Sequence, residues 1–449
     1  MKQTAEQALK DGKRLRAKVS RASLGRWKPA RNRPDPIAML QRTDRGRLKA
    51  LLPIRYARMS QSPFAFLRGA AALMAADLAS MPTTAIRVQA SGDCHVANFG
   101  GFATPERQLV FDINDFDETL PAPWEWDVRR LAASILVATR CFGLREHDCR
   151  DSVCAAVATY RKRMHAYAAM RALDVWYSHL DLEILADDAA TAAARKRWRR
   201  VIQSAAEHTA DNAFPRIATL LHGAPRIADH PPLIDHPPDM ARIGKQVRAI
   251  FQRYRQTLPQ ERRIVLDRYE LVDVARKVVG VGSVGTRCAV VLLMAGPEDP
   301  LLLQFKEARR SVLEPYAGRS QYANQGERVV VGQRMLQSAS DVFLGWTRDD
   351  TGHDFYFRQL RDMKLSIDLA AMHTSDWAEY VKLCGWALAR AHARTGDSAR
   401  IAGYLGKAEQ FDAAMARFAA HYADQTERDH AALLRAIRAG RLPAEPLAS

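Results

Sequence analysis

Three features are missing from this 449-residue sequence, and each absence excludes a class of protein. Its six cysteines include no CxxC pair, so neither a zinc site nor a disulfide framework is indicated, and reduced thiols are expected. Its apolar runs are broken by charge well before the roughly 18 residues that a membrane span needs. The N-terminus is basic and has no apolar h-region, so no secretory signal is predicted. The expected location is therefore cytoplasmic.

Positive charge is concentrated at one end of the chain. The net charge is +17, and residues 1–62 contain 17 lysines and arginines but only four acidic residues. Such a segment binds nucleic acid, an anionic membrane surface or an acidic partner, or it forms a solvated, partly mobile leader. We therefore predict a basic, helical N-terminal arm and keep an anionic partner for it as one alternative.

Hydrophobic periodicity divides the rest of the chain into helical and strand-like parts. Ser62 followed by Pro63 predicts a helix start, and apolar residues recur at helical spacing from there to Pro82. Residues 127–220 are rich in alanine and predict helices with charges on their outer faces. Strand patterns run from about 268 to 360, interrupted by one helix, and the chain then returns to helix.

Two polar motifs follow one another early in the chain, each after a predicted strand. Gly92 to Asn98 reads Gly-Asp-Cys-His-Val-Ala-Asn, and Asn114 to Glu118 reads Asn-Asp-Phe-Asp-Glu. Asp93 and Asn98 lie five residues apart in a loop and can direct two oxygens at one site. Asp115 adds an oxygen ligand of the kind that Mg²⁺ prefers.

Other residues of these motifs each have two interpretations. Asp112 and Asp117 flank Asp115, and one or both are candidate ligands of a second metal ion; the alternative is a solvated turn or a pair of helix caps. His95 is predicted to orient the loop, although an isolated histidine is more often structural. Cys94 is expected to be a small residue filling a tight turn rather than a reactive thiol.

A glycine-rich segment lies much later, between two strand-like runs. A dinucleotide-binding fold needs a helix after its glycines, whereas here a β-branched run follows, so a strand–loop–strand hairpin is predicted. Backbone N–H groups of such a loop can cover phosphates, and the candidate residues are Gly280, Gly282, Ser283 and Gly285.

The strand after this hairpin ends in Lys306, which is placed to pair with α- and β-phosphates. A lysine in that position requires a carboxylate to hold it. Glu327, early on the following helix, is the predicted partner, with Glu314 as the second candidate. The alternative is an ordinary hairpin with a surface lysine.

Together the motifs resemble the kinase-like superfamily, especially its aminoglycoside phosphotransferase and choline kinase branch. That branch carries a His-Gly-Asp-x-His-x-x-Asn loop, then Ile-Asp-Phe, then an Asp-Leu-Ala helix start. The matching segments of this chain are Ser91 to Asn98, Asn114 to Phe116, and Trp126 to Val128 with Leu131 and Ala132.

The resemblance implies roles for individual residues. Asp93 is the catalytic base, Asn98 and Asp115 bind Mg²⁺, and Asp127 is a buried structural acid. ATP is the phosphoryl donor. Ser91 stands where the branch has a histidine, so the bracing of the loop differs from the family pattern.

The order of the motifs also departs from that branch, because the glycine loop and Lys306 follow the catalytic loop instead of preceding it. A circular permutation explains this order. The implied fold is α+β: a two-lobed, protein-kinase-like fold with permuted order, a helix-rich large lobe and a small antiparallel β lobe. The expected divisions are a basic arm (1–62), a helix-rich lobe with the catalytic and metal-binding loops (63–265), a nucleotide-binding β lobe (266–365) and C-terminal helices packing on the large lobe (366–449).

Across nearly its whole length, the chain also resembles a bacterial family of unknown function, domain-of-unknown-function family 2252. This resemblance supplies a label and no reaction. The segments that carry it are Pro53 to Tyr56, Ser62 to Phe66, Gly92 to Gly100, Phe111 to Glu118, Pro123 to Asp127, and Ala389 to Arg394.

The predicted function is Mg²⁺-dependent transfer of the ATP γ-phosphoryl group to a hydroxyl of an unknown small molecule or protein; adenylyl transfer uses similar parts. One alternative is a catalytically inactive, nucleotide-binding or regulatory kinase-like protein, and another is an interaction protein acting through the basic arm. A metal-dependent phosphoesterase also begins with Gly-Asp-x-His. It needs Gly-Asp-x-x-Asp-Arg and Gly-Asn-His-Glu as well, and the sequence contains neither.

Overall fold

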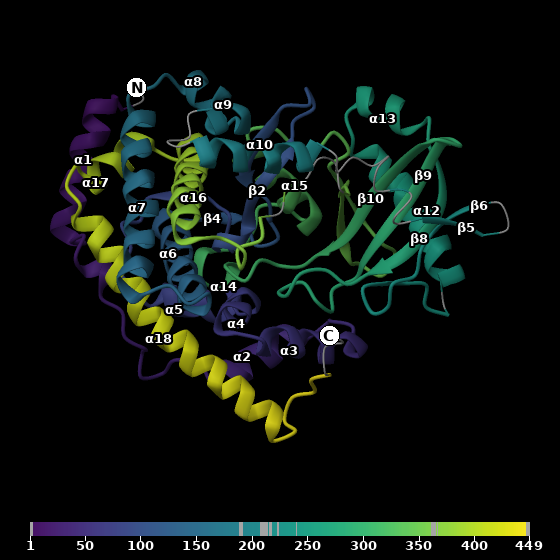
Figure 1. Ribbon diagram of the computed structural model, residues 1–449, viewed down its shortest axis with the longest axis horizontal. Coiled ribbons are helices and arrows are strands. Elements are labelled where there is room, and N and C mark those ends of the chain that lie inside the picture. The colour runs from purple at the N-terminus through teal and green to yellow at the C-terminus, as the bar shows by residue number, and fades with distance from the viewer. Residues whose placement is uncertain are drawn as a thin grey trace.

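A computed structural model describes residues 3–187, 192–206, 214, 218–221, 224–238, 240–360, 365 and 367–445. Within these residues the protein is a mixed α+β structure, with most helices on one side and an antiparallel sheet on the other (Figure 1). Parts of the helical stretch expected over 127–220 lie outside the described residues, as do residues 366 and 446–449 of the expected C-terminal division.

The first half of the chain is helical apart from four short strands. Its elements are α1 (Ala5–Lys18), α2 (Pro36–Asp44), α3 (Leu52–Ser60), α4 (Pro63–Gly69), α5 (Ala71–Ala79), β1 (Arg87–Ala90), β2 (Phe99–Ala103), β3 (Leu109–Ile113), β4 (Leu120–Pro123), α6 (Trp124–Cys141), α7 (Glu146–Ala168), α8 (Ala172–Tyr177), α9 (Leu182–Asp187) and α10 (Ala192–Ala206).

The second half contains the larger sheet and returns to helix. Its elements are β5 (Ala218–Leu221), β6 (Ala224–Ile227), β7 (Ile234–Asp235), α12 (Met240–Gln256), α13 (Gln260–Leu266), β8 (Glu270–Lys277), β9 (Cys288–Gly296), β10 (Asp299–Ala308), α14 (Glu314–Ala317), α15 (Gln325–Leu336), β11 (Gly345–Arg348), β12 (Asp354–Gln359), α16 (Thr374–Thr395), α17 (Ser398–Leu405) and α18 (Gln410–Arg438).

The helix predicted to start at Ser62 begins there, and the Ser62 hydroxyl accepts the Ala65 N–H at 3.0 Å. It does not run unbroken to Pro82. Ala70 leaves the helical region, with φ −113° and ψ 32°, so the segment divides into α4 and α5. This break exposes the carbonyl of Leu67, which accepts a hydrogen bond from the site residue Arg130 at 2.8 Å.

Helix α6 is the centre of the helical part, and every residue from Trp124 to Thr139 is buried. The expectation that charges face outward is wrong for this helix. Four of its five charged residues are buried because the interior provides a polar partner for each, whereas Arg140 in the last turn is partly exposed and pairs with Glu146. Glu125 accepts from the Thr84 hydroxyl, and Arg129 donates to the Leu24 and Pro82 carbonyls; Asp127 and Arg130 serve the site described below.

The larger sheet is antiparallel, with strand order β11-β12-β10-β9-β8-β7. Strands β8 and β9 form the predicted hairpin around the glycine loop, with Arg276 opposite Ala289, so this prediction is confirmed. Helix α12 packs its Ile250 and Tyr254 against one face, next to Phe357 of β12. β7, which precedes residue 266, pairs with β8 of this sheet.

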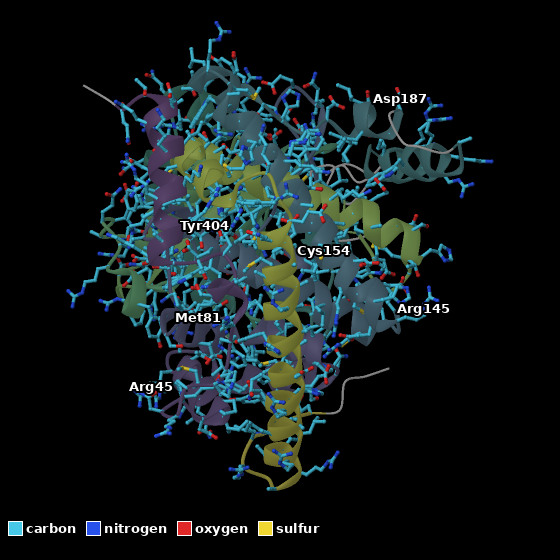
Figure 2. All side chains as sticks on the ribbon, turned by 90° about the vertical axis from the view of Figure 1, so that its left-hand side faces the viewer. Arg45, Met81, Arg145, Cys154, Asp187 and Tyr404 are labelled. Atoms are coloured by element: carbon cyan, nitrogen blue, oxygen red, sulfur yellow. The ribbon has the colours of Figure 1, made fainter. Side chains whose placement is uncertain are left out.

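The basic N-terminal segment is packed into the fold, so its interpretation as a solvated leader is wrong. Helix α1 lies beside α17, near the C-terminal helix α18 (Figures 1 and 2). A Cβ atom on Gly12 would lie 1.9 Å from the Arg400 carbonyl oxygen, so the two backbones touch. Arg33 pairs with both Asp77 (2.8 Å) and Asp429 (2.7 Å) in the interior.

Two small two-stranded sheets hold the polar motifs beside α6. β1 pairs with β4, and β2 pairs with β3, each in antiparallel register. The turn between β1 and β2 carries the first motif, and the turn between β3 and β4 carries the second. In the part of the chain that is described, no helix combines the length and apolarity needed to cross a membrane.

Candidate active site

The loop after β1 has a backbone shape that only glycine allows at its start. Gly92 has φ +84°, and a Cβ there would lie 2.3 Å from the carbonyl oxygen of Glu118. The first motif therefore lies directly against the second. A substitution at Gly92 would separate the two loops.

Buried side chains fix this loop from beneath. Asp127 accepts the Ser91 N–H at 2.7 Å and the Gly92 N–H at 3.0 Å, and it is only 1% exposed. The predicted role of Asp127 as a buried structural acid is thereby confirmed. Tyr380 of α16 donates to the Val96 carbonyl at 2.7 Å. The loop is thus braced through its backbone at Ser91 and Val96.

Asp93 is held by one of its two oxygens. Arg130 of α6 donates to Asp93 Oδ1 from Nε at 2.9 Å and from Nη2 at 2.6 Å. The other oxygen, Oδ2, lies 3.9 Å from His95 Nε2. Burial raises the pKa of Asp93 above its ordinary value, although Arg130 opposes the shift. Asp93 is therefore oriented and retains an oxygen that can accept a proton.

His95 is 3% exposed, and burial lowers its pKa well below the ordinary value, so it is neutral at pH 7. Its Nδ1 has no hydrogen-bond partner among the described residues. Cys94 beside it is fully buried, and burial raises the pKa of its thiol well above the usual range. This agrees with the expectation that Cys94 fills the turn.

Asn98 and Asp115 are the two predicted ligands of Mg²⁺, and both line the cavity described below. The Asn98 amide donates to the Asp93 carbonyl at 2.8 Å, which fixes its oxygen as the free end. Asp115 Oδ1 accepts the Asp117 N–H at 3.1 Å. The described residues contain no cluster of three His, Cys, Asp or Glu side chains suited to a metal. A magnesium ion here would therefore take its other oxygen ligands from water or from a bound phosphate.

Lys306 pairs with Asp117, not with Glu327 or Glu314 as expected from the sequence. The Tyr356 hydroxyl also donates to Asp117, at 2.9 Å. The reason is geometric, because β10 directs Lys306 at the turn after β3. Glu327 lies instead in the first turn of α15, where its N–H donates to the side chain of the N-cap residue Asn324. Burial alone would raise the pKa of Asp117, but Lys306 holds it below the ordinary value.

Asp112 is not a metal ligand in this arrangement. It is 1% exposed and accepts from Arg390 Nη2 at 2.6 Å and from the Ser338 N–H at 2.9 Å. It does not line the cavity that contains Asp115. Neighbouring strand residues face opposite sides, so Asp112 points into the packing between α15 and α16. Its pairing with Arg390 makes it a structural acid.

The glycine loop is in contact with both the second motif and the N-terminal segment. The Ser283 hydroxyl donates to Asp117 Oδ2 at 3.2 Å. On its other side, Arg47 donates to the Val284 carbonyl at 2.5 Å, and Arg58 donates to the Gly280 carbonyl at 2.5 Å. The loop therefore bridges segments that are more than a hundred residues apart.

These groups surround one cavity of about 670 Å³. Its lining includes six residues of the two polar motifs, the glycine loop and a set of arginines. The residues used below are Arg47, Arg55, Arg68, Asp93, His95, Asn98, Asp115, Asp117, Glu118, Gly280, Gly282, Ser283, Arg309 and Arg310. Gly285 and Lys306 lie beside this lining, and Glu327 does not contribute to it.

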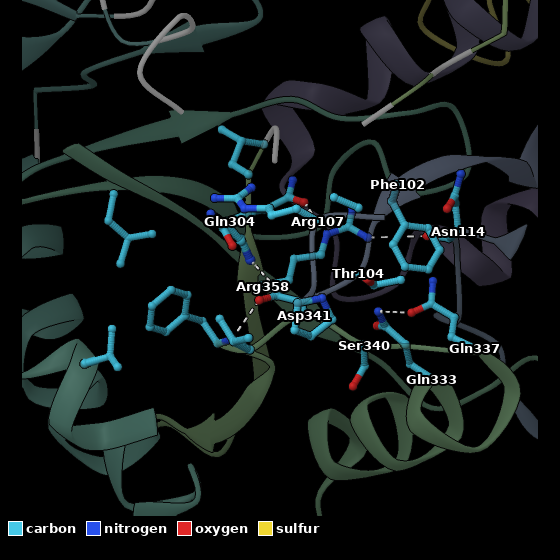
Figure 3. Close-up of a pocket in the computed structure, with 18 of the residues that line it drawn as sticks. Phe102, Thr104, Arg107, Asn114, Gln304, Gln333, Gln337, Ser340, Asp341 and Arg358 are labelled. Atoms are coloured by element: carbon cyan, nitrogen blue, oxygen red, sulfur yellow. Dashed lines mark hydrogen bonds between the residues drawn. The ribbon is translucent and has the colours of Figure 1, made fainter. Parts of the chain in front are cut away.

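A second cavity, also of about 670 Å³, lies beside the first and is drawn in Figure 3. Its floor includes Gln304, two residues before Lys306 on the same face of β10. Arg358 donates to Gln304 Oε1 at 2.8 Å. Asn114, immediately before Asp115, and the amides of Gln333 and Gln337 complete a largely polar wall.

Glu118 links the site to the pH dependence of stability. Burial raises its pKa to about 7, against the hydrogen bond that it accepts from the Val312 N–H at 2.6 Å. The folded protein thus binds a proton that the unfolded chain releases near pH 4.5. The Glu118 contribution to stability is therefore greatest below about pH 4.5 and is lost as the pH rises through about 7.

For Glu118→Gln we expect the free energy of unfolding, relative to the parent, to rise by on the order of 3 kcal/mol between pH 4.5 and pH 8. The glutamine keeps an acceptor for Val312 but does not ionise. Urea unfolding of both proteins across this pH range measures the difference. A constant difference would contradict a raised pKa.

Sequence reasoning missed Arg130, Arg68, Tyr356 and Arg358. Arg130 occurs on a helix whose alanine-rich pattern suggested outward charges, and no local signal places it under a loop 37 residues earlier. Tyr356 and Arg358 alternate along β12, which shows that one face of that strand is polar. That alternation was the available signal.

The features so far define an α+β protein whose charged cleft joins loops from distant parts of the chain. Residues 47–436 match a family described as uncharacterized proteins conserved in bacteria (DUF2252), and because this match covers most of the chain, the chain belongs to that family. No curated protein and no solved structure matches it. The description of this family names no reaction, so the activity must be inferred from the site.

Proposed function

We propose that this protein is an ATP- and Mg²⁺-dependent phosphotransferase with a permuted, two-lobed kinase-like arrangement. The helical part supplies the base and the metal ligands, and the sheet supplies the glycine loop and the lysine. The acceptor is a hydroxyl compound.

One observation carries the proposal. Lys306 of β10 and Ser283 of the glycine loop both bond to Asp117, which is 189 residues from Lys306. Protein kinases likewise combine a glycine-rich loop, a lysine on the third strand of a sheet, and Asp and Asn side chains that hold Mg²⁺. Here the carboxylate that holds the lysine comes from the metal-binding motif instead of a helix.

The chemistry of the donor set fits Mg²⁺. Asn98 and Asp115 offer amide and carboxylate oxygens, and the bound phosphates would complete its coordination. Mg²⁺ held there would neutralise charge that develops on the transferred group. The chain's own cation nearest the phosphates is Lys306: burial would lower its pKa, but Asp117 raises it, so Lys306 stays charged.

Asp93 is assigned as the general base. The acceptor hydroxyl gives its proton to Asp93 Oδ2 as its oxygen bonds to the γ-phosphorus. The bond between that phosphorus and the departing ADP breaks, and the electron pair remains with ADP. Arg130 keeps Asp93 in one orientation because both of its donors bond to Oδ1.

The second cavity is assigned to the nucleoside. Gln304 and Asn114 place it next to Lys306 and Asp115, where the phosphates are assigned. Its amides from Gln304, Gln333 and Gln337 provide both donors and acceptors, which the edge of a nucleobase requires. Arg358, bonded to Gln304, would have to turn aside or stack against the base.

Mg·ATP is expected to raise the melting temperature of the protein, and the chain is expected to release ADP when hydroxyl acceptors are supplied. EDTA should abolish both effects, because a metal ion held by only two protein oxygens is readily removed by a chelator. Thermal-shift and coupled ADP-release assays with and without EDTA test this. Equal melting temperatures with and without Mg·ATP would count against nucleotide binding.

A further inference from the structure

One wall of the active-site cavity is lined by arginines from two distant segments of the chain. Six arginines line the cavity. Within the described chain, only Arg55 and Arg348 form an ion pair with a carboxylate, with Asp44 at 2.5 Å and with Asp354 at 2.5 Å. The four others have no acidic partner there; they are Arg47, Arg68, Arg309 and Arg310.

Three of the arginines converge on one threonine. Thr43 accepts from Arg47 Nε at 3.0 Å and from Arg309 Nη1 at 3.0 Å through its carbonyl oxygen. Its hydroxyl accepts from Arg55 Nη2 at 3.1 Å. Arg310 follows Arg309 and is exposed at the cavity mouth. We call Arg47, Arg55, Arg309 and Arg310 the arginine wall.

The cations of the wall repel one another. Burial, followed by the charges of Arg55 and Arg309, lowers the pKa of Arg47 to about 9. Among the described residues, Asp44 is the one carboxylate that forms an ion pair with the wall, and it also accepts from Tyr56. Guanidinium groups gathered in this way favour a bound anion, since a phosphate can accept two N–H groups from each.

The wall lies next to the residues assigned to catalysis. Arg47 is within electrostatic reach of Glu118, whose carbonyl touches the Gly92 backbone just before Asp93. Arg68 lies between the two regions: its charge acts on Asp93, and its backbone carbonyl lies 3.2 Å from the Cβ position of Gly282. If a phosphate group binds at the wall, the rest of the molecule that carries it would therefore lie close to the base, Asp93.

We propose that the arginine wall binds the phosphate group of an acceptor that is itself a phosphate monoester with a free hydroxyl, an inference that rests on the proposed function. The nucleotide has its own set of groups in the glycine loop, Lys306 and the metal ligands. The wall comes instead from the N-terminal segment and from the residues after β10. Each guanidinium retains N–H donors beyond those that bond to Thr43, Asp44 and the Gly69, Val284 and Arg45 carbonyls.

The test uses inorganic phosphate as the probe, titrated calorimetrically into the full-length protein saturated with Mg²⁺ and the non-hydrolysable analogue AMP-PNP. We expect one phosphate to bind, and Arg309→Gln to weaken it at least tenfold. Arg145→Gln is the matched control, because Arg145 lies at the surface (Figure 2), is 77% exposed and does not line the cavity. Arg309→Lys, which keeps the charge, should restore part of the binding.

Arg310→Gln provides a second variant, since an exposed side chain can be changed without unfolding the protein; we expect a threefold or greater loss. Loss of phosphate binding when AMP-PNP saturates the protein, or equal phosphate affinity in the parent and both glutamine variants, would overturn the proposal. Phosphate binding that depends on Arg309 in a protein that never binds AMP-PNP would refute the proposed function and the acceptor role, while the anion site itself would stand.

A turnover assay separates phosphate monoesters from other acceptors. Glycerol 3-phosphate and glucose 6-phosphate are compared with glycerol and glucose, and glycerate supplies a carboxylate instead of a phosphate. The proposal predicts ADP release that is at least tenfold faster with a phosphate monoester, and dependent on Arg309. Faster release with the neutral parent compounds or with glycerate would contradict it.

Discussion

Asp93→Asn should lower the rate of phosphoryl transfer more than a hundredfold while leaving the affinity for Mg·AMP-PNP within about threefold of the parent. Asparagine keeps the oxygen that Arg130 binds, so the loop remains oriented, but it accepts no proton at pH 7. ADP release measured under saturating ATP gives the rate, and calorimetry gives the affinity.

The matched control is Asp151→Asn, which removes the same charge from an exposed position on α7. It should keep the parental rate. Circular dichroism and unfolding of both variants separate a chemical effect from misfolding. If folded Asp93→Asn retained more than a tenth of the parental rate, the base would have to be another group.

Lys306→Met should lower the affinity for Mg·AMP-PNP at least tenfold and destabilise the fold by about 3 kcal/mol. Removing one partner of a buried ion pair leaves an uncompensated charge, and Lys306 is 3% exposed while Asp117 is 25% exposed. Methionine keeps most of the apolar length of the side chain. Calorimetry measures the first effect and urea unfolding the second.

A double-mutant cycle assigns the energy to the pair. Asp117→Asn combined with Lys306→Met should destabilise the protein by less than the sum of the two single changes, because neither variant side chain carries a charge. Nucleotide affinity should not recover in the double variant. Strict additivity of the two free energies would mean that Lys306 and Asp117 do not interact.

Local features of the fold were predictable from the sequence. The Ser62 cap and the hairpin around the glycine loop each depend on neighbouring residues, and both occur as expected. The strand that carries Lys306 also occurs, but it continues past Lys306 to Ala308. The break at Ala70 directly follows Gly69, a residue that disfavours helix, so the sequence contained a local signal for it.

Long-range pairings account for the errors. Asp112 and Asp117 look alike in the sequence, yet Asp112 pairs with Arg390 of α16 and Asp117 with Lys306 of β10. Glu327 has the right side-chain type and spacing for a lysine partner, but in the folded protein the carboxylate beside Lys306 is that of Asp117. Such choices depend on how distant elements dock, which local pattern does not encode.

The most direct measurement is the anomalous scattering of Mn²⁺, which substitutes for Mg²⁺, in crystals of the protein grown with AMP-PNP. The proposed function predicts one peak within roughly 2.0–2.3 Å of the side-chain oxygens of Asn98 and Asp115, in contact with nucleotide phosphates that lie under the glycine loop. Ordered nucleotide with its metal elsewhere, or nucleotide bound away from Lys306 and Asp115, would contradict it.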